Sequence, residues 1–117
     1  MEDEKKRHDD NKITILPADY EPLKKPIQLD LERDEEWKMW IGENEDVGIR
    51  VAAYSLEKLK EEAIIMLDLM IHEYLIRDPP PRMSEKLARN VEELKKYYDP
   101  SKKDKVGEWE DGDEEDN

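Results

Sequence analysis

The spacing of apolar residues changes near Ser55, and this change constrains the fold more than any other feature. Before Ser55, Ile27, Leu29 and Leu31 alternate with polar residues, which is the pattern of a β-strand with one wet face. After Ser55, apolar residues recur every three or four positions, as on one face of a helix. The helical set is Leu56, Leu59, Ala63, Met66, Leu67, Met70 and Tyr74. The two periods together predict an α+β protein.

A three-stranded antiparallel sheet is expected before the helix. Its strands are predicted at 27–32, 37–41 and 49–53, separated by a turn at 33–36 and a loop at 42–48. The short turn makes the first two strands a hairpin. Trp37 and Trp40 fall on opposite faces of the second strand, so one is expected in the core. Trp40 is a candidate interface anchor if it is exposed.

A shorter β-prone segment, Ile13 to Leu16, precedes three prolines that exclude a helix across the interval. This segment is predicted to be either an edge strand or an arm that lies on a partner. Ile13, Ile15 and Leu16 are therefore candidate interface residues.

Two helices are predicted to pack with the sheet. Ser55 is the N-cap of the long helix, which should run to about Arg77, where three consecutive prolines stop it. Ser84 caps a second helix, which Pro100 ends.

The middle of the long helix, residues 63–71, is apolar nearly all round, so something besides the sheet must cover it. One reading is that the second helix folds back onto it. The other is a subunit interface through Ile64, Leu69 and Ile71.

Charge divides the chain into a folded part and two polar ends. Charged residues make up 45% of the sequence and hydrophobic residues 36%, so the ends bury too little apolar surface to order themselves. We expect one domain, with a disordered arm at 1–12, an α+β binding module at 13–99 and a disordered acidic tail at 100–117. The net charge of −13 disfavours direct binding to nucleic acid or an anionic membrane and favours a protein partner with a basic surface.

The tail is the sharpest functional feature. Closely spaced carboxylates present a line of negative charge much as a single-stranded nucleic acid does, and Trp109 among them could stack where a base would lie. The alternative is that the tail only aids solubility. The candidate tail-binding residues are Glu108, Trp109, Glu110, Asp111, Asp113, Glu114, Glu115 and Asp116.

No constellation for catalysis is found. His8 lies in the arm and His72 stands alone on the long helix, while Ser-His-acid sets, phosphate loops and metal-ligand clusters are missing from the sequence. We therefore expect no enzyme activity, no catalytic residues, no cofactor and no metal. Without cysteine, a signal peptide or a membrane span, the expected location is cytoplasmic, and abundant Glu and Lys fit a thermophile.

The region from Ile27 to about Leu67 resembles the HicB-like antitoxin fold, in which two strands joined by an acidic turn lead to a third strand and a helix. The residues that carry the resemblance are 27–32 (IQLDLE), 34–41 (DEEWKMWI) and 53–57 (AYSLE), with Leu59 and Ala63. The resemblance implies neutralisation of a small basic RNase toxin. The fourth strand of that family, after the helix, has little room here before Pro79.

A small module with an acidic C-terminal tail also resembles the accessory subunits of archaeal B-family replicative DNA polymerases. There the tail is implied to restrain strand displacement by competing for the DNA path. Our leading hypothesis is accordingly an accessory subunit of a nucleic-acid-processing enzyme, such as a DNA polymerase holoenzyme. An antitoxin is the alternative, and a structural protein solubilised by its tail is a third class.

Overall fold

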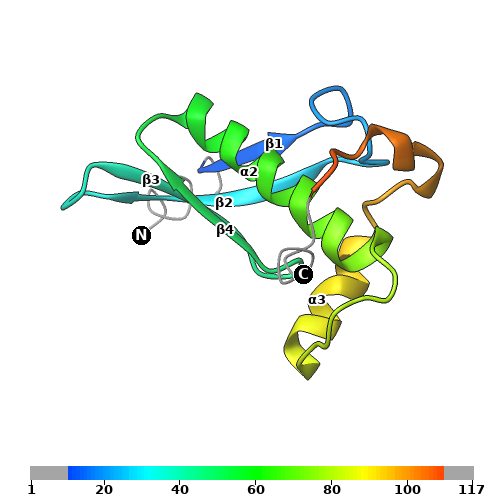
Figure 1. Cartoon of the computed structure of the whole chain (residues 1–117). Coiled ribbons are helices and arrows are strands. Elements are labelled where there is room, and N and C mark those ends of the chain that lie inside the picture. The colour runs from blue at the N-terminus through cyan, green and yellow to red at the C-terminus, as the bar shows by residue number, and fades with distance from the viewer. Residues whose placement is uncertain (1–10, 110–117) are drawn as a thin grey trace.

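The fold is α+β, with one antiparallel sheet covered on one face by a long helix (Figure 1). The structure is a computed structural model, and it describes residues 11–109. The sheet contains four strands in the order β1-β2-β3-β4, so each strand pairs with its neighbour in sequence. Their bounds are Lys12–Ile15, Ile27–Asp34, Met39–Asn44 and Ile49–Ala53.

The fourth strand is the first departure from the sequence prediction, which gave the sheet three. Ile13 pairs with Leu29 and Ile15 with Ile27, so the segment after Lys12 forms an edge strand of this chain's own sheet. Its short length and the prolines that follow made an edge strand and a partner-bound arm equally consistent with the sequence. The pairing selects the edge strand.

The β2–β3 turn lies two residues later than expected, because β2 runs to Asp34 and the turn covers residues 35–38 instead of 33–36. β3 begins at Met39, two positions after the predicted start at Trp37. The Asp34 carboxylate accepts hydrogen bonds from the backbone N–H groups of Glu36 and Trp37, at 3.0 and 3.1 Å, and Lys38 adopts a positive φ of 57°. The side chain of Asp34 thus keeps Trp37 in the turn, where it is 65% exposed.

The long helix, α2, covers Leu56–Ile71 and continues as a π-helical turn, η1, over His72–Ile76. The hydroxyl of Ser55 caps it by accepting from the Lys58 N–H. The predicted end at about Arg77 therefore agrees with the structure. The second helix, α3, covers Glu85–Lys95, and the hydroxyl of Ser84 accepts from the Leu87 N–H.

The core lies between α2 and the sheet. The apolar residues of β2 and β4 alternate as the sequence predicted, and they face the buried stripe of α2. The fully buried side chains include Ile15, Ile27, Leu29, Ile49, Leu59, Leu67, Ile71 and Leu94. Such burial is the main source of stability in a domain of this size.

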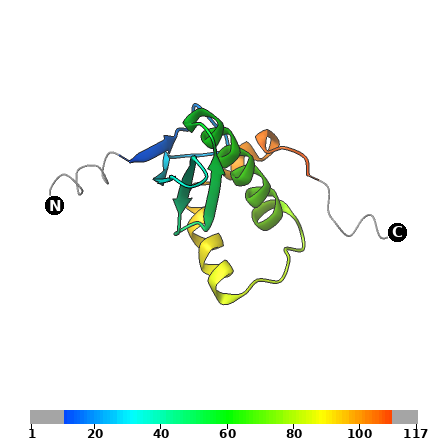
Figure 2. The same ribbon diagram turned by 90° about the vertical axis from the view of Figure 1, so that its left-hand side faces the viewer.

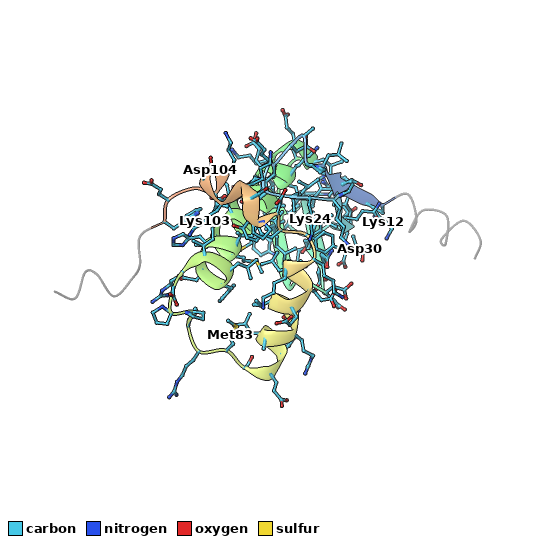
Figure 3. The ribbon with its side chains drawn as sticks, turned by 90° about the vertical axis from the view of Figure 1, so that its right-hand side faces the viewer. Lys12, Lys24, Asp30, Met83, Lys103 and Asp104 are labelled. Atoms are coloured by element: carbon cyan, nitrogen blue, oxygen red, sulfur yellow. The ribbon has the colours of Figure 1, made fainter. Side chains whose placement is uncertain are left out.

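The other face of the sheet is mostly polar, although Met39 and Ile41 of β3 also lie on it. Figure 2 shows α2 on one side of the strands and α3 beyond one end of them. The uncovered face carries ion pairs between neighbouring strands, such as Lys12–Asp30 at 2.6 Å (Figure 3) and Arg50–Glu43 at 3.2 Å.

The second helix leaves part of α2 uncovered. α3 packs near η1, and the Asn90 side chain donates to the backbone carbonyls of Glu45 and Asp46 in the β3–β4 turn. Ile65 and Leu69 remain 50% and 36% exposed on the outer side of α2. Among the described residues, no helix combines the length and the apolar character that a lipid bilayer crossing requires.

Candidate functional site

The C-terminal segment returns to the folded module after α3. Tyr98 forms an isolated antiparallel bridge with Leu23, and the Asp99 N–H donates to the carbonyl of Pro22 at 2.9 Å. The Asp99 carboxylate then accepts from the backbone N–H and the hydroxyl of Ser101, which starts a 3-10 helix, η2, over Pro100–Lys105. These contacts direct the chain across the end of α2 (Figure 1).

The segment after η2 is bonded to one carboxylate, that of Asp68 on α2. The Gly107 N–H donates to both carboxylate oxygens, at 3.1 Å to Oδ1 and 3.0 Å to Oδ2. The indole Nε1 of Trp109 donates to Oδ2 at 2.8 Å, and the hydroxyl of Tyr20 donates to Oδ1. We call Asp68, Tyr20, Gly107 and Trp109 the Asp68 clamp.

The sequence builds the clamp from three separate parts. Asp68 directly follows the buried Leu67, so helical geometry puts its carboxylate on the flank of α2 and not in the core. Tyr20 comes from the β1–β2 connection and is itself buried. Val106, also buried, brings Gly107 within reach of Asp68.

Burial, and then the hydrogen bond to Asp68, raises the pKa of Tyr20 well above its usual value of 10. A phenolate there would be desolvated and would face a carboxylate. The hydroxyl therefore stays protonated and acts as a donor to Asp68. A carboxylate satisfied by neutral O–H and N–H donors needs no cation partner to be half-buried.

A groove of about 710 Å³ lies beside the clamp. His72 and Ile76 line it from η1, and Lys103, Val106 and Trp109 are among the residues that line it from the C-terminal segment. The Nδ1 atom of His72 is buried and has no hydrogen-bond partner among the described residues. Within that same part of the chain, no group of three or more His, Cys, Asp or Glu side chains could hold a metal ion.

Of the eight candidate tail-binding residues, the structure describes the first two, Glu108 and Trp109. Glu108 is exposed, whereas Trp109 is half-buried and hydrogen-bonded to Asp68, so its indole is not the free group that we expected. Residues 100–109, which we assigned to a disordered tail, form η2 and the clamp segment. Glu110, Asp111, Asp113, Glu114, Glu115 and Asp116 lie outside the described residues, as does most of the predicted arm at 1–12.

Most of the predicted interface residues pack within this chain. Ile15 and Ile71 are fully buried, and Ile13, Trp40 and Ile64 pack against the core. Trp40 shares the helix-facing side of the sheet with Gly42 and Val51 and lies 5.0 Å from the guanidinium of Arg33. Leu16 and Leu69 alone of the seven candidates are exposed.

Asp68, Tyr20 and Gly107 were missed in the sequence. One signal could have pointed to Asp68, because it is the single acid within the apolar run 63–71. A charged residue at such a position is stable only with hydrogen-bond partners. Neither its partners nor the need for glycine at 107 could be found without the long-range contacts.

Comparison of the chain with models of protein families, with curated proteins and with solved structures gives no match.

Proposed function

We propose that this chain is a non-enzymatic accessory subunit of a nucleic-acid-processing enzyme, such as a replicative DNA polymerase. Its acidic C-terminal run, Glu110 to Asp116, would modulate the access of nucleic acid to that enzyme. One observation carries the proposal: the run starts directly after Trp109, which is hydrogen-bonded to the folded module. The carboxylates are therefore tethered at a defined place and not at the end of a long free linker.

The length of the run limits where it can act. From Trp109 to Asp116 the chain spans at most about 25 Å. A tether this short gives an effective concentration of roughly millimolar at any basic surface within reach. A weak intrinsic affinity of the carboxylates for that surface is then enough to compete with the phosphates of a nucleic acid.

Docking would fall to the folded module. Ile65 and Leu69 on the outer side of α2, with Leu16 after β1, are exposed aliphatic side chains that a partner could cover. Ile13 and Ile15, which pack in the sheet, no longer qualify. In this proposal the acidic run regulates the access of nucleic acid to the enzyme, and the exposed apolar residues attach the subunit to the enzyme.

The test begins with identification of the enzyme by native co-purification and mass spectrometry. Complexes with the full chain, with residues 110–117 deleted, or with the six acids of that run changed to Asn or Gln are then compared on a primed template with a downstream duplex. We expect complex formation to persist, and strand displacement or DNA affinity to rise in both variants at low salt. Equal activity of all three complexes at low salt would reject the regulatory role.

A second candidate, an antitoxin for a small basic RNase, is favoured by the order of elements. β2, the acidic turn, β3, β4 and α2 follow one another as in the HicB-like fold. It predicts a neighbouring gene for a short basic protein that is toxic when expressed alone and harmless when expressed with this chain. Absence of such a gene would count against it.

A further inference from the structure

The Asp68 clamp joins the two parts of the molecule on which the proposed function depends. Its carboxylate lies on α2, the helix that also carries the exposed Ile65 and Leu69. The same carboxylate accepts from Gly107 and from Trp109, the residue directly before the acidic run. Three donors converge on this one side chain, one from the β1–β2 connection and two from the C-terminal segment. A surface aspartate on a helix needs no such arrangement for solubility.

Residue 107 shows how closely the segment approaches. A Cβ atom added at Gly107 would lie 2.5 Å from Oδ2 of Asp68 and 3.6 Å from Nε1 of Trp109. The first distance is far below a van der Waals contact, so a side chain at 107 requires the Asp68 carboxylate or the segment to shift, and the hydrogen bond from Tyr20 opposes a shift of the carboxylate. Glycine at 107 and aspartate at 68 therefore form a matched pair.

We propose that Asp68 is a positioning residue that fixes the point at which the acidic run leaves the module. This inference rests on the proposed function and adds to it that the run acts from a set position, not only as a tethered polyanion. Both oxygens of Asp68 accept hydrogen bonds from the segment, and the Tyr20 hydroxyl restrains the carboxylate by donating to Oδ1.

The consequence for the run is a change of reach. With the clamp closed, the last fixed residue is Trp109, and the run spans at most about 25 Å to Asp116. With the clamp open, the last buried residue is Val106, and the span grows to about 35 Å. Since effective concentration falls roughly as the −3/2 power of tether length, opening should weaken the action of the run about twofold.

Two variants open the clamp in different ways. Asp68→Ala removes both acceptor oxygens, so the Gly107 N–H and the Trp109 indole lose their partner. Gly107→Ala leaves Asp68 intact and introduces the clash with Oδ2. Glu62→Gln is the matched control, because it removes the same charge from an exposed position of α2. Thermal unfolding of the full chain checks that each variant folds.

The first measurement is the state of the segment in the full-length protein. The indole N–H resonance of Trp109, assigned with Trp109→Phe, and the amide exchange rate of Gly107 report the clamp directly. We expect the resonance to shift and the exchange to accelerate by about tenfold in both variants. The control should change neither. An unchanged resonance and exchange rate in both variants would overturn the proposal.

The second measurement uses the co-purified enzyme on a primed template with a downstream duplex. The readout is strand displacement relative to extension on a single-stranded template. The full chain should suppress this ratio about twice as strongly as either open-clamp variant, while Glu62→Gln should match the full chain.

The outcomes separate the two proposals. If the variants free the segment yet suppress strand displacement as well as the full chain, the positioning role is overturned and the regulatory run stands. If deletion of 110–117 from the unmodified chain changes nothing, the proposed function fails, and the positioning role fails with it.

Discussion

The layer of α2 on the sheet and the C-terminal part of the chain differ in the contacts that hold them. In the first, fully buried side chains such as Ile27, Leu59 and Leu67 interlock between α2 and the strands. The C-terminal part adds Leu94, Tyr98 and Val106 to the same core, and polar side chains also bond it to the layer: Asn90 binds the β3–β4 turn, and Asp68 binds Gly107 and Trp109. Apolar burial stabilises both parts, and the directed bonds help to set where the C-terminal part lies.

This comparison predicts the largest loss of stability for a truncation in the layer. Leu67→Ala removes a fully buried side chain one position before Asp68 and should lower the free energy of unfolding by about 2–5 kcal/mol. Leu69→Ala, at a 36% exposed position of the same helix, is the control and should cost under about 1 kcal/mol. Urea denaturation measures both. Similar losses for the two variants would mean that Leu69 is as important to the core as Leu67.

The layer was the predictable part of the fold. The alternation in 27–32 and 49–53 and the helical spacing after Ser55 follow from burial of one face, and this burial leaves a mark at every second, third or fourth residue. The fourth strand was less visible, because Lys12–Ile15 is short and its partner had to be inferred. The contacts of the Asp68 clamp produce no periodic pattern of residues in the sequence. The bond between Asp68 and Gly107 joins residues far apart in sequence through single atoms, so it could be found only in three dimensions.

The Tyr20 hydroxyl bonds to the carboxylate that holds the C-terminal segment on α2. Its removal should lower the free energy of unfolding by less than Leu67→Ala does. Tyr20→Phe deletes a donor to the Asp68 carboxylate, which should cost about 1–2 kcal/mol at pH 7. Since the pKa of Tyr20 is raised in the folded state, its stabilising contribution is present below pH 10 and is lost as the pH rises above that value. The unmodified protein should therefore lose its advantage over the variant in strongly alkaline solution.

Urea denaturation at pH 7, 9, 10 and 11 measures that gap. Tyr54→Phe, at a 70% exposed position, is the control and should change the free energy of unfolding by less than about 0.5 kcal/mol at pH 7. A gap that stays constant from pH 7 to pH 11 would contradict the role given to the Tyr20 hydroxyl.

Asn90 also bonds the C-terminal part of the chain to the sheet, and its side chain should contribute less to the free energy of unfolding than the Tyr20 hydroxyl. Asn90→Ala removes donations to the carbonyls of Glu45 and Asp46, at 3.0 and 2.9 Å, and should cost about 1 kcal/mol. Hydrogen exchange should accelerate in α3 while β2 keeps its protection. Arg89→Ala, at an exposed neighbouring position, is the control. Accelerated exchange in β2 as well would show that α3 and the sheet open as one unit. The C-terminal part would then not be separable from the layer of α2 on the sheet.

The smallest loss of stability is expected for a substitution on the uncovered face of the sheet. Arg50→Gln breaks the ion pair with Glu43, whose side chain is 36% exposed while that of Arg50 is 59% exposed. Solvent screens such a pair, so the free energy of unfolding should fall by less than about 0.5 kcal/mol, and 1 M salt should remove the difference. Polar contacts would then fall into two classes. Those with Asp68 and Asn90 determine where a segment lies, whereas the Arg50–Glu43 pair joins strands that backbone hydrogen bonds already hold. A loss above about 1 kcal/mol for Arg50→Gln would erase this distinction, because an exposed pair would then count as much as the bonds that fix the C-terminal segment.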